Sequence, residues 1–144
     1  MLTRDATVAY RPEARVSTLA ISKDGRISVW SEGEGIVFLS KIRNDELDDD
    51  LLFWKADGRV TGTIISNNSI FVLDEIFGIN CLNSQLETVW KKEIEGGGFE
   101  FKELKDKIAV VDSLGRLHIV TKQGDIIPID EDYSSISMME VFSE

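Results

Sequence analysis

Four short apolar runs between Val60 and Lys92 constrain this chain more than any other feature. The stretch reads VTGTIISNNSIFVLDEIFGINCLNSQLETVWKK, and its runs are Val60–Ile65, Ile70–Asp74, Ile79–Asn83 and Leu86–Trp90. They are separated by Asn67-Asn68, Phe77-Gly78 and Ser84-Gln85. Short runs rich in Val, Ile, Thr and aromatic residues, bounded by Asn, Gly and Ser, are typical of antiparallel strands. The stretch therefore predicts one meandering four-stranded sheet.

The same unit recurs on both sides of this stretch. Strand by strand, the aligned segments are Ile70–Asp74 with Ile108–Asp112, Gly78–Leu82 with Gly115–Ile119, Val60–Ile65 with Val16–Ile21, and Ile70–Leu73 with Ile27–Trp30. The units cover residues 16–55, 60–92 and 99–130. A further single strand is expected on each side, at residues 7–11 and 135–142.

A tandem repeat of about forty residues with four strands per unit predicts an all-β fold made of β-propeller blades. A single sheet of this size cannot bury both of its faces, so neighbouring sheets are expected to stack face to face. The prediction is three four-stranded antiparallel blades plus one extra strand at each end. Three blades do not close a ring, because a propeller needs at least about four.

Particular residues in each unit have expected structural roles. The glycine before the third strand, Gly78 or Gly115, supplies the positive φ that a tight hairpin requires. Asp74 and Asp112 precede these turns, where a carboxylate accepts hydrogen bonds from turn amides. A structural role is therefore favoured over a catalytic one. The aromatic residues expected in the cores between blades are Trp30, Trp54 and Trp90.

Two segments resemble known propeller repeats. Residues Gly78 to Lys91 resemble the quinoprotein-like (PQQ-like) repeat, which has a glycine, an alternating strand ending in Leu-Asp or Leu-Asn, a turn, and a tryptophan before a basic residue. Its turn at Ser84-Gln85 lacks the Thr-Gly of that repeat. Residues Lys23 to Ser31 are similar to the Asp-Gly…Trp-Asp stretch of WD40 repeats. Both resemblances imply blade architecture, and since propellers host many functions they do not define one.

Composition excludes several classes of function. The net charge of −10 repels phosphate backbones and no Lys/Arg cluster overrides it, so no nucleic-acid partner is expected. No apolar run approaches the ~20 residues that span a bilayer, so no membrane partner is expected. The N-terminus lacks a secretory pattern, and Cys81 is the only cysteine. A cytoplasmic location is therefore expected.

No pattern predicts a catalytic, cofactor or metal site. His118 is the only histidine, so a metal site with nitrogen and sulfur ligands is not expected. The nucleophile-elbow, zinc-protease, Walker and Rossmann motifs are absent. Gly96-Gly97-Gly98 lacks the following helix and lysine of a phosphate-binding loop, which favours a connection between blades.

An acidic insertion interrupts the first unit and is a candidate partner-contact loop. Its spacing lacks the central glycine and terminal glutamate of an EF-hand, so Ca²⁺ binding is the least favoured interpretation. A solvated loop is favoured first and a partner contact second, because insertions in repeat proteins map to binding loops. The candidate residues are Asn44, Asp45, Glu46, Asp48, Asp49 and Asp50.

The leading functional hypothesis is a non-catalytic propeller segment that serves as an interaction or assembly scaffold. Its partner would be another protein, or a second copy pairing through open sheet edges; missing blades of a longer chain are a further way to complete the ring. The alternative is part of a ligand-binding or enzymatic propeller of the quinoprotein type. An enzyme should bring polar groups together at the channel mouth, where the inner strands offer only Ser17, Thr18, Thr61, Thr63, Glu100 and Lys102.

Overall fold

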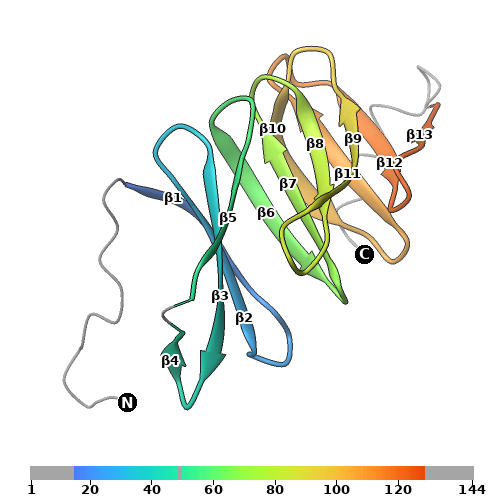
Figure 1. Ribbon diagram of the computed structural model, residues 1–144. Helices are drawn as coiled ribbons and strands as arrows, with labels where there is room; N and C mark the ends of the chain where they lie inside the picture. Colours follow the sequence, from blue (N-terminus) through green and yellow to red (C-terminus); the bar gives the residue numbers. More distant parts are fainter. Residues whose placement is uncertain (1–14, 49, 129–144) are drawn as a thin grey trace.

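Three antiparallel β-sheets stand side by side in the computed structural model, which describes residues 15–48 and 50–128 (Figure 1). None of these residues is helical. Within each sheet consecutive strands pair with one another, except in the first sheet, where the third strand pairs with both the fourth and the fifth. The predicted all-β fold of β-propeller blades is therefore confirmed. The expected flanking strands at 7–11 and 135–142 lie outside the described residues.

The sheets are called blades 1, 2 and 3 in chain order. Blade 1 consists of β1 (Val16–Ile21), β2 (Ile27–Glu32), β3 (Ile36–Arg43), β4 (Glu46–Leu47) and β5 (Leu52–Lys55). Blade 2 consists of β6 (Val60–Ser66), β7 (Ser69–Asp74), β8 (Gly78–Leu82) and β9 (Thr88–Glu93). Blade 3 consists of β10 (Gly98–Glu103), β11 (Lys107–Asp112), β12 (Leu117–Thr121) and β13 (Ile126–Ile127).

Two apolar cores join the three blades. Blade 2 is buried on both faces, and its strands β7 and β8 are almost entirely inaccessible to solvent. The alternation of side chains along β7 sends Val72 towards blade 1 and Leu73 towards blade 3. The inner strands β1, β6 and β10 lie next to one another along one side of the stack (Figure 1). Because one small sheet cannot form a core alone, the apolar cores of this chain lie between stacked sheets.

The strand register corrects the alignment of the first two units. A bulge near the start of each inner strand brings Val16 opposite Glu32, Val60 opposite Asp74, and Gly98 opposite Asp112. Glu32 is thus the blade 1 counterpart of the two aspartates. Counting back from these residues, Trp30 corresponds to Val72, not to Leu73 as the sequence alignment had it. The hairpin between β1 and β2 is longer than that between β6 and β7. The sequence alignment underestimated this difference and therefore placed Trp30 one residue out of register.

The acidic insertion is a hairpin, so its prediction as a loop was wrong in part. Asn44 and Asp45 have φ of 54° and 64°, as the two central residues of a tight hairpin turn require. Glu46 belongs to β4 and pairs with Arg43 at the end of β3. One residue beyond β4, the N–H of Asp48 donates to the Lys41 carbonyl of β3 at 2.8 Å and extends the pairing of the hairpin. Asp50 follows the hairpin, and Asp49 is not among the described residues.

One turn type recurs, and in blade 2 it strains a leucine. In the turn from Asp112 to Gly115 the N–H of the fourth residue donates to the first carbonyl at 3.0 Å, and Gly115 has φ of 85°. In the turn after β8, Leu86 takes the glycine position with φ of 59° and donates to the Asn83 carbonyl. A left-handed leucine costs about 1–2 kcal/mol. Its buried side chain in the core between blades 1 and 2 offsets that cost.

Gly115→Ala should lower the free energy of unfolding by about 1–2 kcal/mol, because it introduces a Cβ at positive φ. Nothing lies within 4 Å of that Cβ, so backbone strain is the whole effect. Gly97→Ala should cost more, since its φ is 71° and its Cβ would overlap the backbone of Glu75. Urea unfolding of both variants measures the difference. Equal losses would contradict this ordering.

Candidate functional site

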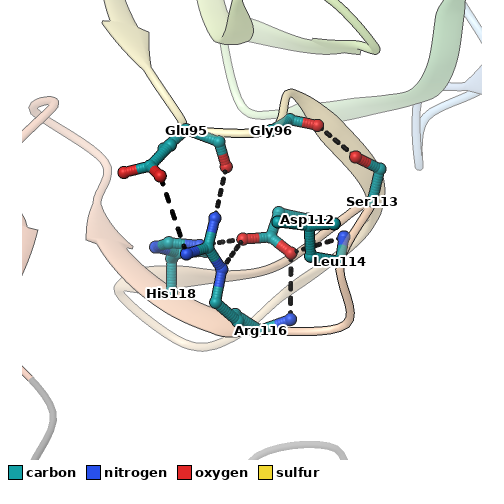
Figure 2. A network of polar contacts seen from close by, with 7 residues as sticks. All are labelled: Glu95, Gly96, Asp112, Ser113, Leu114, Arg116 and His118. Atoms are coloured by element: carbon teal, nitrogen blue, oxygen red, sulfur yellow. Dashed lines mark hydrogen bonds and ion pairs between the residues drawn. The ribbon is translucent and has the colours of Figure 1, made fainter.

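A polar network around Asp112 joins the turn after β11 to the connection between blades 2 and 3 (Figure 2). Asp112 Oδ1 accepts the backbone N–H groups of Leu114 and Arg116, both at 2.9 Å. Its Oδ2 accepts Arg116 Nε at 2.8 Å and His118 Nε2 at 2.9 Å. An ionised carboxylate only accepts, so His118 Nε2 carries the proton in this contact.

The electrostatics of this network hold Asp112 ionised. Burial alone would raise the pKa of the Asp112 carboxyl. The hydrogen bonds from His118, Arg116 and Leu114 outweigh burial and lower that pKa to about 2. Arg116 also donates to the Glu95 carbonyl at 3.0 Å, and Ser113 donates to the Gly96 carbonyl. The guanidinium and the imidazole both donate to the Asp112 carboxylate, so the network orders the turn and leaves no free nucleophile.

Each blade carries a buried carboxylate at the same place, with a different donor. Asp74 Oδ1 accepts the N–H groups of Ile76 and Phe77, and its Oδ2 accepts Asn80 Nδ2 at 2.9 Å. In blade 1, Glu32 Oε2 accepts Trp30 Nε1 at 2.8 Å. The sequence interpretation missed these donors. The equal spacing from Asp74 to Asn80 and from Asp112 to His118 was the signal that would have found two of them.

Asp112→Asn should destabilise the fold in a pH-dependent way. The folded pKa of about 2 lies below the ordinary value of 3.8, so the ionised carboxylate stabilises the protein above about pH 4. That contribution, about 2 kcal/mol near neutral pH, is lost as the pH falls through about 2. The difference in unfolding free energy between wild type and variant should therefore shrink in acid, as measured by urea unfolding.

Asp125→Asn is the matched control, because Asp125 is an exposed aspartate in the next turn of the same blade. It should leave the unfolding free energy within about 0.5 kcal/mol of wild type across the same pH range. A pH-independent loss in Asp112→Asn would show that the charge of the carboxylate is not what stabilises the turn.

The outer-strand tryptophans Trp54 and Trp90 pack into the cores between blades and donate to the following blade. Trp54 lies against the core between blades 1 and 2, and its Nε1 donates to Thr88 Oγ1 at 3.0 Å. Trp90 lies against the core between blades 2 and 3, and its Nε1 donates to the Lys122 carbonyl at 3.1 Å. Each indole therefore combines apolar packing with one polar link across the stack.

Trp30 lies on the other face of blade 1, not in the core with Trp54. It follows Val29, which points into the core between blades 1 and 2, so alternation turns Trp30 away from blade 2. Its ring stacks on Phe38 with centroids 5.8 Å apart. At the equivalent position of blade 2, Val72 packs against the preceding blade. A role for Trp30 in a core with a further blade stays a prediction.

This face of blade 1, turned away from blade 2, is called the outward face. Leu19 is opposite Trp30 and is 63% exposed, and Phe53 is opposite Phe38 and is 71% exposed. In blade 3 the position of Leu19 is taken by Phe101, whose ring packs against blade 2. The exposed large apolar residues of the outward face are Val16, Leu19, Ile21, Ile36 and Phe53.

A polar pocket of about 350 Å³ opens where the inner hairpins of the three blades meet. The β1–β2, β6–β7 and β10–β11 hairpins line it, together with the turn after β12. Lys122 from that turn donates to Ser66 Oγ at 3.1 Å and to Glu103 Oε2 at 2.6 Å. Lys23 and Lys105 line the same pocket. None of these residues was singled out from the sequence, because the repeat alignment does not show which hairpins converge.

Of the inner-strand polar residues expected at a channel mouth, Ser17, Thr18 and Thr61 make structural hydrogen bonds and do not converge on one site. Ser17 and Thr18 both share hydrogen bonds with Ser31 Oγ, at 2.8 and 2.7 Å. Thr61 donates to the Gly98 carbonyl of blade 3 at 2.9 Å. These hydroxyls therefore serve contacts within and between blades. Three further residues named from the sequence are Thr63 on β6 and Glu100 and Lys102 on β10.

The acidic hairpin presents its charges to solvent. Arg43 Nε lies 3.5 Å from Asp48 Oδ2, and the Arg43 side chain is largely exposed. Among residues 15–48 and 50–128, no group of three His, Cys, Asp or Glu side chains is placed to hold a metal ion. The same residues contain no helix long and apolar enough to cross a membrane.

Comparison with known proteins identifies the fold but no family. No protein-family model and no curated protein matches the chain. The computationally designed Ika4 protein is 11% identical, with a TM-score of 0.75 over 90% of this chain and 81% of that one. BamB from Moraxella catarrhalis, a PQQ-like β-propeller, is 18% identical, with a TM-score of 0.69 over 83% of this chain.

The computationally designed Ika8 protein is 13% identical, with a TM-score of 0.67 over 78% of this chain. The chain spans only 35% of Ika8 and 38% of BamB. At these identities the likenesses show a propeller-type fold alone. The resemblance of individual segments to PQQ-like or WD40-like repeats stays a prediction.

Proposed function

We propose that this chain is a non-catalytic β-propeller scaffold that packs the outward face of blade 1 against a blade of a second copy. The observation that carries the proposal is the exposure of large apolar side chains on that face, led by Leu19 and Phe53. Contiguous exposed apolar surface of this kind marks interaction sites.

The packing of the other two blades supports this assignment. Val72 of blade 2 and Val110 of blade 3 occupy the position of Trp30 and lie in cores formed with the preceding blade. The outward face therefore repeats a surface that the fold buries twice within this chain. Within the chain such a face packs on an apolar face of the preceding blade, so an apolar sheet face of a second copy is the matching partner.

Face packing is favoured over pairing of strand edges. The outer strand β9 carries Lys91 and Lys92, and lysine on an edge strand opposes strand addition. The outward face, in contrast, exposes Val16, Leu19, Ile21, Ile36 and Phe53, although Lys55 lies opposite Ile36 on the same face and is also exposed. The acidic hairpin from Arg43 to Asp48 extends from the same blade, and we propose it as a secondary contact for a basic partner surface.

An enzymatic role of the quinoprotein type receives less support. Ser17, Thr18 and Thr61 are engaged in structural hydrogen bonds, so they do not point together at a substrate. The Asp112 network is likewise saturated by its own turn and by His118. No specific observation favours catalysis over scaffolding.

Leu19→Asp and Phe53→Asp should each weaken self-association about tenfold or more, because burying one such side chain contributes about 1.5–3 kcal/mol. Sedimentation velocity from about 1 to 100 μM measures the effect, a range that covers micromolar affinity. Leu114→Asp is the control, since Leu114 is equally exposed but lies in the β11–β12 turn. A wild-type chain that stays monomeric across this range would contradict the proposal.

A further inference from the structure

We propose that the polar pocket at the inner hairpins binds a small oxyanion, a carboxylate or a phosphate group, between the ammonium groups of Lys23 and Lys105. This inference rests on the pocket and is independent of the outward face of blade 1. At about 350 Å³ the pocket falls at the lower end of the range of small-molecule sites. It therefore suits a compact ligand.

The floor of the pocket is fixed before any ligand binds. Lys122 donates to Ser66 in blade 2 and to Glu103 in blade 3, and its third N–H reaches the Lys105 carbonyl at 3.3 Å. The Lys122 carbonyl in turn accepts Trp90 Nε1. Lys122 is thus held by two blades, and its charge is already matched by Glu103.

Glu103, which accepts a hydrogen bond from Lys122 at the base of the pocket, is ionised. Burial would raise the pKa of its carboxyl, but the hydrogen bonds from Lys122 and Ser66 and the charges of Lys122 and Lys23 lower it. An ionised Glu103 neutralises Lys122 and leaves two further ammonium groups at the pocket. The remaining carboxylate, Asp24, accepts Ser22 Oγ at 2.7 Å and the Arg26 N–H at 3.1 Å, so it is engaged in its own turn.

Lys23 and Lys105 are the groups left to meet a ligand. Within the described ranges, no hydrogen bond or close ion pair engages either ammonium group. They come from different blades, Lys23 from the β1–β2 hairpin and Lys105 from the β10–β11 hairpin. Three lysines and two carboxylates line the pocket, which makes it locally positive in a chain of net charge −10. An anion gains from both ammonium groups at once.

The side-chain amide of Asn67 adds a neutral donor to the two ammonium groups. Asn67 lies at the tip of the β6–β7 hairpin with φ of 54° and lines the pocket between the two lysines' hairpins. Its amide can donate to an anion oxygen. The single large apolar contact is Ile65, so the lining matches a polar ligand better than an apolar one.

The test is a titration of the full chain with inorganic phosphate, and separately with succinate, at constant ionic strength. Amide shifts of Lys23, Asn67 and Lys105 in ¹H–¹⁵N spectra should saturate with a single affinity. A stronger response to phosphate or to succinate distinguishes the two sources of oxyanion. Sodium chloride at matched ionic strength should give no saturable change.

The double variant Lys23→Gln/Lys105→Gln should weaken binding about tenfold, as expected for the loss of two solvent-exposed charge contacts. Lys41→Gln removes one charge from an exposed site on β3 outside the pocket and should leave the affinity unchanged. The proposal is overturned if neither phosphate nor succinate gives saturable amide shifts. It is also overturned if Lys41→Gln loses as much affinity as Lys23→Gln/Lys105→Gln.

Discussion

Face-to-face packing of apolar sheets is the interaction on which the rest of this structure depends. Neither blade 1 nor blade 3 can bury its apolar residues without blade 2, and β7 supplies side chains to both cores. Burying one such side chain contributes about 1.5–3 kcal/mol, so each core outweighs any single polar contact in the chain. Trp54 and Trp90 add a directional element, because each indole must also reach an acceptor on the next blade. The stack is thereby fixed in spacing and in rotation.

The buried carboxylates show how polar groups are accommodated within that stack. Glu32, Asp74 and Asp112 stand at the end of the second strand in each blade and are almost inaccessible to solvent. An unpaired buried carboxylate is costly. Asp74 and Asp112 are matched by N–H donors from their own turns and by a side chain of their own blade, and Glu32 is matched by Trp30 of its blade. The donor differs from blade to blade: tryptophan, asparagine or histidine. The position of the buried carboxylate is therefore the same in all three blades, whereas the side chain that donates to it varies.

The two proposed surfaces both follow from stacking. The outward face of blade 1 is apolar because it has the pattern of faces that are buried in blades 2 and 3. The polar pocket exists because stacking brings three inner hairpins together, each of which alone is an ordinary exposed turn. One surface suits a second sheet and the other suits a small anion. They lie on different features of the fold, so each can be altered without touching the other.

The sequence by itself determined the strands, the turns and the all-β repeat, because period-two alternation and residues such as Gly115 and Asp112 act locally. It did not determine which face each strand presents. The sequence alignment was one residue off at the β1–β2 hairpin and matched Trp30 to Leu73, which faces the following blade. Trp30 in fact faces away from blade 2, since a shift of one residue sends every side chain to the opposite face. The convergence of Lys23, Lys105 and Lys122 and the donors to each buried carboxylate were likewise decided only by the tertiary structure. The three lysines come from turns far apart in the chain, which no local pattern connects, whereas the equal spacing from Asp74 to Asn80 and from Asp112 to His118 gave only a hint of the donors.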